Sequence, residues 1–515
     1  MWNDQLDVDA ACVFLAIRIE ELSFFLMVKS AVKITRLPYR IKPNPSRVIT
    51  RPFVWTEEPR NIRRIERVLD LPEFEVIEHL EQLLSDYLDQ HPDILGTWRE
   101  HFDLVSRYIP EWAGALSTER ELLIGAYFSM EYAIESAALF NPSIIPSRYQ
   151  DDVSIGSTRF FMSLRATGEG HLSSIVFRRG VIDKDNRITM ETPPKTSRPL
   201  KAVSDALFST RRFGRILSDI DVLDPFQKQI LAVLGDEFSL ADLKNALANA
   251  EASDSLPASW ELSAQNMLAL ASSNYRLLIP SDMDPGEMVI FPRSENESRG
   301  IEDLRLVTLT EDDGSSVLYG TYTAYNGIAT FPTLMESRDP RFIDIHTLAG
   351  RYAKNKGMAL FPRRINGKYV MSGRLDGECL YILESSNVLV WNESKLSQEP
   401  RYWWELSVIG NCGSPIETKE GWLLLTHGVG PMRQYCIGAV LLDLDDPVKV
   451  IGRTKEPLMM PMGDERVGYV PNVVYTCGAM KHNDSILIPY AMSDMMTTFA
   501  LVNLDELLDC LKHGG

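Results

Sequence analysis

Two acidic residues and an arginine stand together where a strand is expected to begin, in Gly300-Ile-Glu-Asp-Leu-Arg-Leu. Carboxyl groups beside a cation are suited to general acid–base catalysis, in which a positioned side chain gives a proton to the reacting group or takes one from it. Side chains alternate between the two faces of a strand, so we expect Asp303 and Arg305 on one face and Glu302 on the other. One acid is then the catalytic candidate, and the other is structural. An alternative stays open, in which the acid pair caps a turn at the rim of a sheet.

The motifs of several other chemistries are missing from the sequence. It contains no Walker loop, no Gly-x-Gly-x-x-Gly after a strand, no Gly-x-Ser-x-Gly elbow and no His-Glu-x-x-His. The 6 cysteines are scattered and form no Cys-x-x-Cys pair, so neither a zinc site nor a disulfide framework is predicted. We therefore expect no metal ion and no cofactor, and reduced thiols in a cytoplasmic protein.

Composition restricts the class of partner. The 515 residues carry a net charge of −18, which argues against nucleic acid, because binding to a phosphate backbone needs a positive face. With 45% hydrophobic and 24% charged residues, the chain has the balance of a globular protein. The longest apolar run, residues 12–28, is interrupted by Arg18, Glu20 and Glu21, so we expect neither a membrane span nor a secretory signal. Met27 is an alternative start of the natural chain.

The spacing of hydrophobic residues divides the chain into regions. Steps of three and four predict a helical segment over 58–139, after an N-terminal extension over 1–57 that is partly extended. Short strands between Gly, Asn, Asp and Pro turns predict a mainly β domain over 140–503, as a sandwich, barrel or propeller. Helical spacing returns at about 200–273, where Ser239 and Asp242 are typical of a helix start, and predicts a helical insertion. Residues 504–515 predict a C-terminal helix and tail.

Several motifs in order along the chain give the acid pair a context. The stretch Gly300-Ile-Glu-Asp-Leu-Arg resembles the Gly-x-Glu-Asp-Pro-Arg motif of glycoside hydrolase family 130, the β-mannoside phosphorylases and related β-mannosidases, with Leu304 in place of the usual proline. Further matches are Tyr322-Thr-Ala-Tyr-Asn, Asn355-Lys-Gly-Met-Ala-Leu-Phe-Pro, Gly421-Trp-Leu-Leu-Leu-Thr-His-Gly-Val, Ala439-Val-Leu-Leu-Asp-Leu-Asp-Asp-Pro, Gly468-Tyr-Val-Pro-Asn-Val-Val and Tyr490-Ala-Met-Ser-Asp. The resemblance covers roughly residues 140–508 and implies a five-bladed β-propeller with its active site in the central depression. The N-terminal helices lie outside it.

The resemblance also implies roles for individual residues. Asp303 corresponds to the general acid of the family. The implied substrate-binding residues are Asn141, Ser143, Arg165, Glu302, Arg305, Tyr325 and Asp494, and the implied phosphate-binding residues are Asn326, Lys356, His427 and Arg433. Tyr325 stands where many of the phosphorylases have an arginine, which is a departure from the phosphorylase pattern. Without the resemblance, each of these positions also has a plain structural explanation, as a turn residue or a hydrogen-bonded surface group.

The function that follows is an inverting carbohydrate-active enzyme. The resemblance implies that it cleaves a terminal β-mannoside, β-1,2-linked or similar, by phosphorolysis to mannose 1-phosphate, and that Asp303 protonates the leaving oxygen through a sugar hydroxyl. The expected partners are a small carbohydrate and inorganic phosphate, without nucleic acid or membrane; the oligomeric state stays open, a homo-oligomer included. One alternative is an inverting β-mannosidase that activates water with Glu417 or Glu465, since such an enzyme needs a second carboxylate. Another is a sugar-binding propeller without catalysis.

Overall fold

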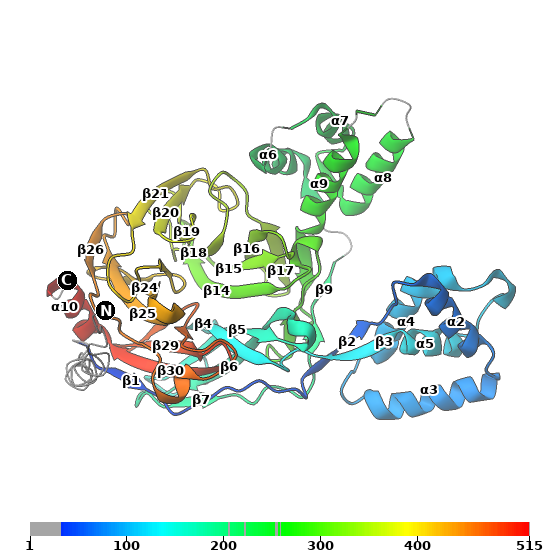
Figure 1. Cartoon of the computed structure of the whole chain (residues 1–515), viewed down its shortest axis with the longest axis horizontal. Coiled ribbons are helices and arrows are strands. Elements are labelled where there is room, and N and C mark those ends of the chain that lie inside the picture. The colour runs from blue at the N-terminus through cyan, green and yellow to red at the C-terminus, as the bar shows by residue number, and fades with distance from the viewer. Residues whose placement is uncertain (1–31, 204–206, 221–222, 253–255, 258, 514–515) are drawn as a thin grey trace, which may run out of the picture.

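The structure is a computed structural model that describes residues 32–203, 207–220, 223–252, 256–257 and 259–513. The expectations for residues 1–31, including the alternative start at Met27, lie outside the described residues. The fold is mainly β, as the sequence predicts, and its strands are gathered into sheets that surround a common centre (Figure 1).

Within the described ranges, five sheets have four or more strands. The first sheet contains β4 (Ala138–Pro146), β5 (Thr158–Thr167), β6 (Ser173–Ile182), β7 (Ile188–Met190), β8 (Arg198–Pro199) and β13 (Met288–Ile290), and the second contains β9 (Lys201–Ala202), β12 (Tyr275–Leu278), β14 (Ile301–Thr310), β15 (Ser316–Tyr325), β16 (Thr330–Ser337) and β17 (Phe342–Thr347). The third contains β18 (Lys356–Leu360), β19 (Tyr369–Arg374), β20 (Leu380–Ser385) and β21 (Glu393–Gln398), and the fourth contains β22 (Val408–Asn411), β23 (Ile416–Thr418), β24 (Gly421–Val429), β25 (Tyr435–Leu442) and β26 (Val450–Arg453). The fifth contains β27 (Val474–Tyr475), β28 (Met480–His482), β29 (Ser485–Met492), β30 (Met496–Asn503) and, from the start of the described chain, β1 (Ile34–Arg36).

Each sheet has one edge strand that contacts the neighbouring sheets: β4, β14, β18, β22 and β27. Side chains and backbone groups join these edges; Asn411 Nδ2 of β22 donates to Gly357 O of β18, and Cys477 N, just after β27, donates to Pro142 O of β4 at 2.8 Å. The fifth sheet contains both β1 and β30, which pair antiparallel, so the two ends of the described chain meet in one sheet. The ring of contacts places residues from five distant parts of the sequence side by side.

The helical segment interrupts a two-stranded ribbon. Strand β2 (Val48–Pro52) pairs antiparallel with β3 (Ser129–Ala133), and the chain between them folds into α2 (Glu58–Leu69), α3 (Glu73–Tyr87), α4 (Ile94–Val105) and α5 (Thr118–Tyr127), beside the ring of sheets (Figure 1). Apolar residues at helical spacing, such as Ile65, Val76 and Leu123, are buried between these helices. The helices end at Tyr127, and strands begin at Ser129, so the expected helical range of 58–139 extends too far.

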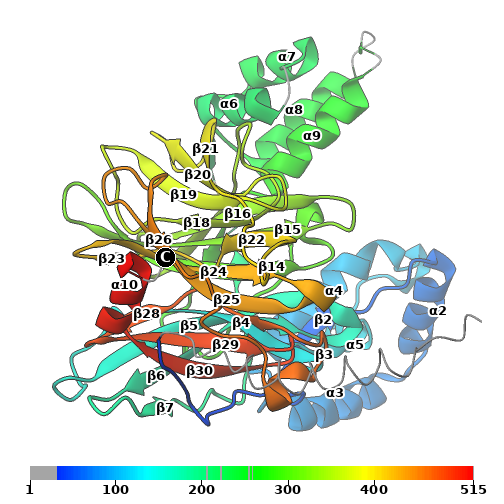
Figure 2. The ribbon, with the colours of Figure 1, turned by 60° about the vertical axis from the view of Figure 1, so that its left-hand side comes forward.

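The helical insertion lies between β9 and β12 of the second sheet. Its helices are α6 (Thr210–Ile220), α7 (Pro225–Val233), α8 (Leu240–Glu251) and α9 (Trp260–Ser272), with the short pair β10 (Leu207–Ser209) and β11 (Glu237–Ser239) beside them. Helix α8 begins directly after Ser239, whose hydroxyl accepts from Asp242 N, as the sequence predicts. Figures 1 and 2 both show the insertion standing apart from α2–α5.

The last helix, α10 (Leu504–His513), covers the apolar outer surface of the fourth and fifth sheets through Leu507 and Leu511. No helix in the described part of the chain is long and apolar enough to cross a membrane.

Candidate functional site

A β-bulge turns both acids of the 300–306 motif toward the same cation. The pairing of β14 with β15 shifts between Glu302 and Arg305, and Asp303 has φ 60°, a left-handed conformation that Asp and Asn tolerate better than most residues. Arg165 Nη2 donates to Glu302 Oε1 at 3.0 Å, and Arg165 Nη1 lies 3.6 Å from Asp303 Oδ1. The alternation expected for a regular strand is therefore wrong here, because the extra residue of the bulge brings Asp303 to the guanidinium that Glu302 also contacts.

The Asp303 carboxyl is held in place from the neighbouring sheet. Asn141 Nδ2 donates to Asp303 Oδ1 at 2.7 Å. Asn141 itself lies on a second bulge, between Phe140 and Ser143 of β4, and has φ 48°. The Asp303 side chain keeps 18% of its surface exposed, so it is recessed but open to a ligand.

Asp303 and Asp494 have different acidities. Burial raises the pKa of the Asp303 carboxyl. The positive charges of Arg165, Arg305 and Lys356, together with the hydrogen bond from Asn141, outweigh burial, so the pKa of Asp303 lies below its ordinary value. Burial and the negative charge of Asp303 raise the pKa of Asp494 to about 7. Below about pH 7, Asp303 therefore carries the negative charge of the pair while Asp494 keeps its proton.

A group of basic side chains faces these acids. Lys356 and Arg374 are register partners in β18 and β19, so their side chains stand on one face of the sheet. Lys356 Nζ donates to Glu302 Oε2 at 2.7 Å, and Arg374 Nη1 lies 3.3 Å from His427 Nε2. No motif in the sequence points to Arg374, which in the structure stands beside two of the expected phosphate-binding residues, Lys356 and His427.

His427 is a neutral imidazole that orients Arg374. Its Nδ1 lies 3.0 Å from Asn411 O, so this nitrogen carries the proton and Nε2 is left to accept from Arg374. Burial and the charge of Arg374 lower the pKa of His427 to about 3. His427 therefore positions Arg374 and carries no positive charge of its own.

Arg305 belongs to the same group of basic side chains, and both terminal nitrogens of its guanidinium form hydrogen bonds. Its Nη1 donates to Asp303 O at 2.9 Å, and its Nη2 donates to the hydroxyl of Tyr475 in β27 at 2.8 Å. The thiols of Cys412 and Cys477 lie nearby, and burial raises the pKa of Cys412 to about 12 and that of Cys477 well above its ordinary value. Both thiols are thus protonated and are not nucleophiles.

Among the described acidic, basic and amide side chains of this site, three buried polar atoms have no hydrogen-bond partner: Asn141 Oδ1, Arg305 Nε and Arg374 Nε. Buried polar atoms are nearly always paired in proteins, so three unpaired ones in one cluster are exceptions that call for a functional explanation. The group is also rich in positive charge, although the whole chain has a net charge of −18. We call the residues Asn141, Arg165, Glu302, Asp303, Arg305, Lys356, Arg374, His427 and Asp494 the acid–base cluster.

Four other expected site residues are placed differently. Ser143 is fully buried, and its hydroxyl accepts from Leu306 N at 2.9 Å, so it joins β4 to β14. The Tyr325 hydroxyl donates to Gly327 O, and Asn326 Oδ1 accepts from two backbone N–H groups of its own turn. Among the described residues, neither side chain forms a hydrogen bond or ion pair with the cluster. Arg433 is exposed and acts on the cluster through its charge, which opposes the raised pKa of Asp494.

The two carboxylates expected to activate water in a hydrolase are already engaged. Glu417 forms an ion pair with Arg363 at 2.8 Å. Glu465 is 2% exposed, pairs with Arg36 at 2.9 Å and accepts from the Tyr490 hydroxyl at 2.6 Å. A base role for either carboxylate would first require these contacts to break.

A turn signal in the sequence predicts the hairpin that carries Arg374, but not its pairing with Lys356. Residues Asn366-Gly367 are typical of a tight hairpin turn. Counting outward from this turn places Lys356 opposite Gly377, whereas the observed register, which shifts between Lys356 and Ala359, pairs Lys356 with Arg374. No sequence signal predicts the contact of Tyr475 with Arg305, because the two residues are 170 positions apart in the sequence and lie in different sheets.

Comparison with known proteins places the chain in a family. A family model described as β-1,4-mannooligosaccharide phosphorylase matches residues 282–513. The 1,2-β-oligomannan phosphorylase of Thermoanaerobacter sp. (strain X514) is 36% identical over 231 residues, which are 42% of this chain and 73% of that protein. The β-1,2-mannobiose phosphorylase of Listeria innocua is 30% identical over 235 residues, 43% of this chain and 63% of that protein.

The solved structures include a β-1,2-mannobiose phosphorylase from Listeria innocua in complex with β-1,2-mannobiose. It has a TM-score of 0.42 and 22% sequence identity, and the match covers 73% of this chain and 92% of that one. The match to the family model extends over the motif that carries Asp303 and over the strands that carry Lys356 and His427. By its sequence, the chain belongs to glycoside hydrolase family 130, a family of carbohydrate-active enzymes.

Proposed function

We propose that this protein cleaves terminal β-mannosides by phosphorolysis and releases α-mannose 1-phosphate. The observation that carries the proposal is the Lys356–Arg374 pair, in which Lys356 contacts Glu302 of β14 and its register partner Arg374 has an unpaired buried Nε. Arginine and lysine at such a place suit a phosphate oxygen, since charge-assisted hydrogen bonds to phosphate are short and strong. The engaged states of Glu417 and Glu465 make the water-activating alternative less favourable.

The mechanism assigns a proton path to Asp303. Its carboxyl gives a proton to a sugar hydroxyl, which gives its own proton to the glycosidic oxygen. The bond between the anomeric carbon and that oxygen breaks while a phosphate oxygen attacks from the opposite face, so the β configuration becomes α. Phosphate beside Lys356 and Arg374 offsets the positive field that lowers the pKa of Asp303, and this helps Asp303 to hold its proton once both substrates are bound.

The remaining cluster residues bind the sugar in this proposal. Asn141 Oδ1, unpaired and buried, accepts from a sugar hydroxyl, and Arg165 keeps Asp303 and Glu302 aligned. Ser143 supports the bulge of β4 from behind rather than contacting the substrate. We also propose that the five sheets are the blades of a five-bladed β-propeller, supported by the ring of contacts between their edge strands.

The linkage can be tested with two disaccharides. The family model is described by a β-1,4 activity, and both relatives above are named for β-1,2-linked mannosides. We propose β-1,2-mannobiose as the better substrate. With phosphate present, mannose 1-phosphate should form faster from β-1,2-mannobiose than from β-1,4-mannobiose; the reverse order would assign the β-1,4 linkage, and no product from either would contradict the proposed activity.

The raised pKa of Asp494 predicts a pH dependence of mannoside binding. Below about pH 7 the neutral carboxyl can donate a hydrogen bond to a sugar hydroxyl, and above that pH the carboxylate can only accept. Loss of one donated hydrogen bond costs about 1–1.5 kcal/mol, so β-1,2-mannobiose should bind about tenfold more weakly at pH 8.5 than at pH 6. Calorimetric titration without phosphate measures this change free of the titration of phosphate itself.

Asp494→Asn provides the control for this pH dependence. The amide keeps a donor at all pH values, so binding to the variant should vary little between pH 6 and pH 8.5. If the variant weakened with pH as strongly as the parent protein, Asp494 would not be the titrating group.

A further inference from the structure

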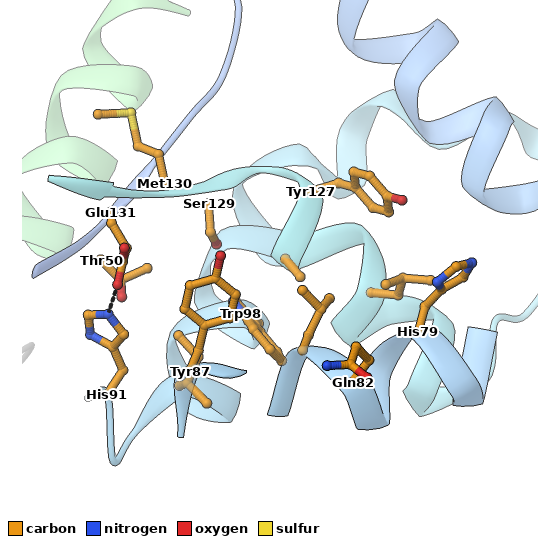
Figure 3. Close-up of a pocket in the computed structure, with 14 residues that line it drawn as sticks. Thr50, His79, Gln82, Tyr87, His91, Trp98, Tyr127, Ser129, Met130 and Glu131 are labelled. Carbon is orange, nitrogen blue, oxygen red and sulfur yellow. Dashed lines mark hydrogen bonds and ion pairs between the residues drawn. The ribbon is translucent and has the colours of Figure 1, made fainter. Parts of the chain in front are cut away.

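The helical segment contains a cavity that the proposed activity does not use. It has a volume of about 290 Å³ and lies between α3, α4, α5 and the β2–β3 ribbon (Figure 3). All of its lining residues fall between Thr50 and Glu131, before the range 282–513 that the family model matches. The volume is near the lower end of the roughly 300–1,000 Å³ typical of small-molecule sites.

The cavity combines aromatic walls with polar ends. Tyr87 and Trp98 occupy its middle, between the His91–Glu131 pair at one end and the side chains of His79 and Gln82 at the other (Figure 3). His91 Nε2 lies 2.8 Å from Glu131 Oε1. His79 and Gln82 are exposed at one end, and the Glu131 side chain keeps 40% of its surface exposed at the other.

Several polar groups that line the cavity have no partner. Among the described residues, no hydrogen bond is formed by the Tyr87 hydroxyl, the Trp98 indole N–H or the His79 ring, and Trp98 is 3% exposed. A hydrocarbon ligand would remove water from these groups without replacing its hydrogen bonds, at a cost in free energy. The ligand must therefore carry hydroxyl or similar groups on an apolar frame.

The charge of the lining indicates a neutral ligand. The 14 described residues that line the cavity include one carboxylate, Glu131, and neither lysine nor arginine. That carboxylate is already matched by His91, so an anion would meet no free cation and a cation would have to displace the imidazole. A neutral molecule with one apolar face and a rim of hydroxyl groups fits all these features, and a pyranose ring is such a molecule.

We propose that this cavity is a second saccharide site, in which an apolar C–H face of a sugar ring packs on Tyr87 while its hydroxyl groups meet the His91–Glu131 pair, His79 and Gln82. The choice of mannose as the sugar rests on the proposed function; the existence of the site does not. Because the cavity lies in the segment between β2 and β3, it would hold carbohydrate beside the ring of sheets without occupying the acid–base cluster.

The test uses the full chain and counts its sugar sites. All variants are made in the Asp303→Asn background, so that the β-1,2-mannobiose probe is not consumed, and binding is measured by calorimetry and by saturation-transfer NMR without phosphate. Tyr87→Ala removes the aromatic wall, and Ala126→Trp fills the cavity from α5. Tyr149→Ala is the matched control, because Tyr149 is 62% exposed and lies in the loop after β4.

The parent and the Tyr149→Ala control should bind two sugars, and both cavity variants should lose one site, with at least about tenfold weaker binding there. When Tyr87→Ala is made in the wild-type protein, its rate of phosphorolysis should stay within about twofold of the wild-type rate. A single site in the parent, or two sites that persist in both cavity variants, would overturn the inference. Loss of a site in the cavity variants without any phosphorolysis by the wild type would leave this site standing and reject the proposed activity.

Discussion

Asp303→Asn is expected to reduce the turnover of β-1,2-mannobiose by about 10²–10⁴-fold, because the variant cannot supply the proton that the leaving oxygen needs. Asn tolerates the left-handed conformation that residue 303 adopts at φ 60°, so the bulge of β14 should persist. The measurement is the initial rate of mannose 1-phosphate release at saturating phosphate and mannobiose.

Two controls separate a chemical effect from a structural one. Asp185→Asn makes the same substitution at an exposed turn and should leave the rate unchanged. The thermal unfolding midpoint of Asp303→Asn should lie near that of the parent protein. A rate for Asp303→Asn within a few-fold of the parent would remove Asp303 from the proton path.

Arg374→Ala is expected to raise the phosphate KM by about 10–100-fold, since a hydrogen bond to a charged group contributes about 1.5–3 kcal/mol. The binding of mannobiose without phosphate should change little, because the sugar is assigned to Asn141, Asp303 and Asp494. Lys356→Ala should raise the phosphate KM in the same direction, with a further effect on the sugar because Lys356 also holds Glu302 at 2.7 Å. Steady-state kinetics with each substrate varied in turn measure the two effects.

Arg401→Ala is the matched control for the loss of a guanidinium, because Arg401 is exposed and its side chain makes no ion pair in the described structure. Its phosphate KM should equal that of the parent. An Arg374→Ala enzyme whose mannobiose binding fails while its phosphate KM is unchanged would place Arg374 on the sugar and leave the phosphate position to other residues.

The elements of the fold were predicted where a short pattern specifies local structure. The helix start at Ser239 and Asp242 follows from neighbouring residues, and it is confirmed. The boundary of the helical segment was wrong, because the strand that follows Tyr127 closes a ribbon with β2, more than seventy residues earlier. Such a pairing leaves no signal within a local window of sequence.

The candidate site was predicted in part. Motifs identified Asp303, Lys356 and His427, but the assumption of a regular strand separated Glu302 from Asp303. A bulge depends on how two strands pair, so residue alternation along one strand could not show it. The neutral state of His427 likewise arises from burial and from Arg374, which only the assembled sheets reveal.

The identity of the nucleophile tests the central claim most directly. The protein is supplied with β-1,2-mannobiose and phosphate in water enriched in ¹⁸O, and the mass of every mannosyl product is recorded. Phosphorolysis predicts mannose 1-phosphate without solvent ¹⁸O, because all of its phosphate oxygens come from the phosphate supplied. Free mannose carrying one ¹⁸O at the anomeric carbon, formed at the same rate when phosphate is omitted, would show that water is the nucleophile and would contradict the account.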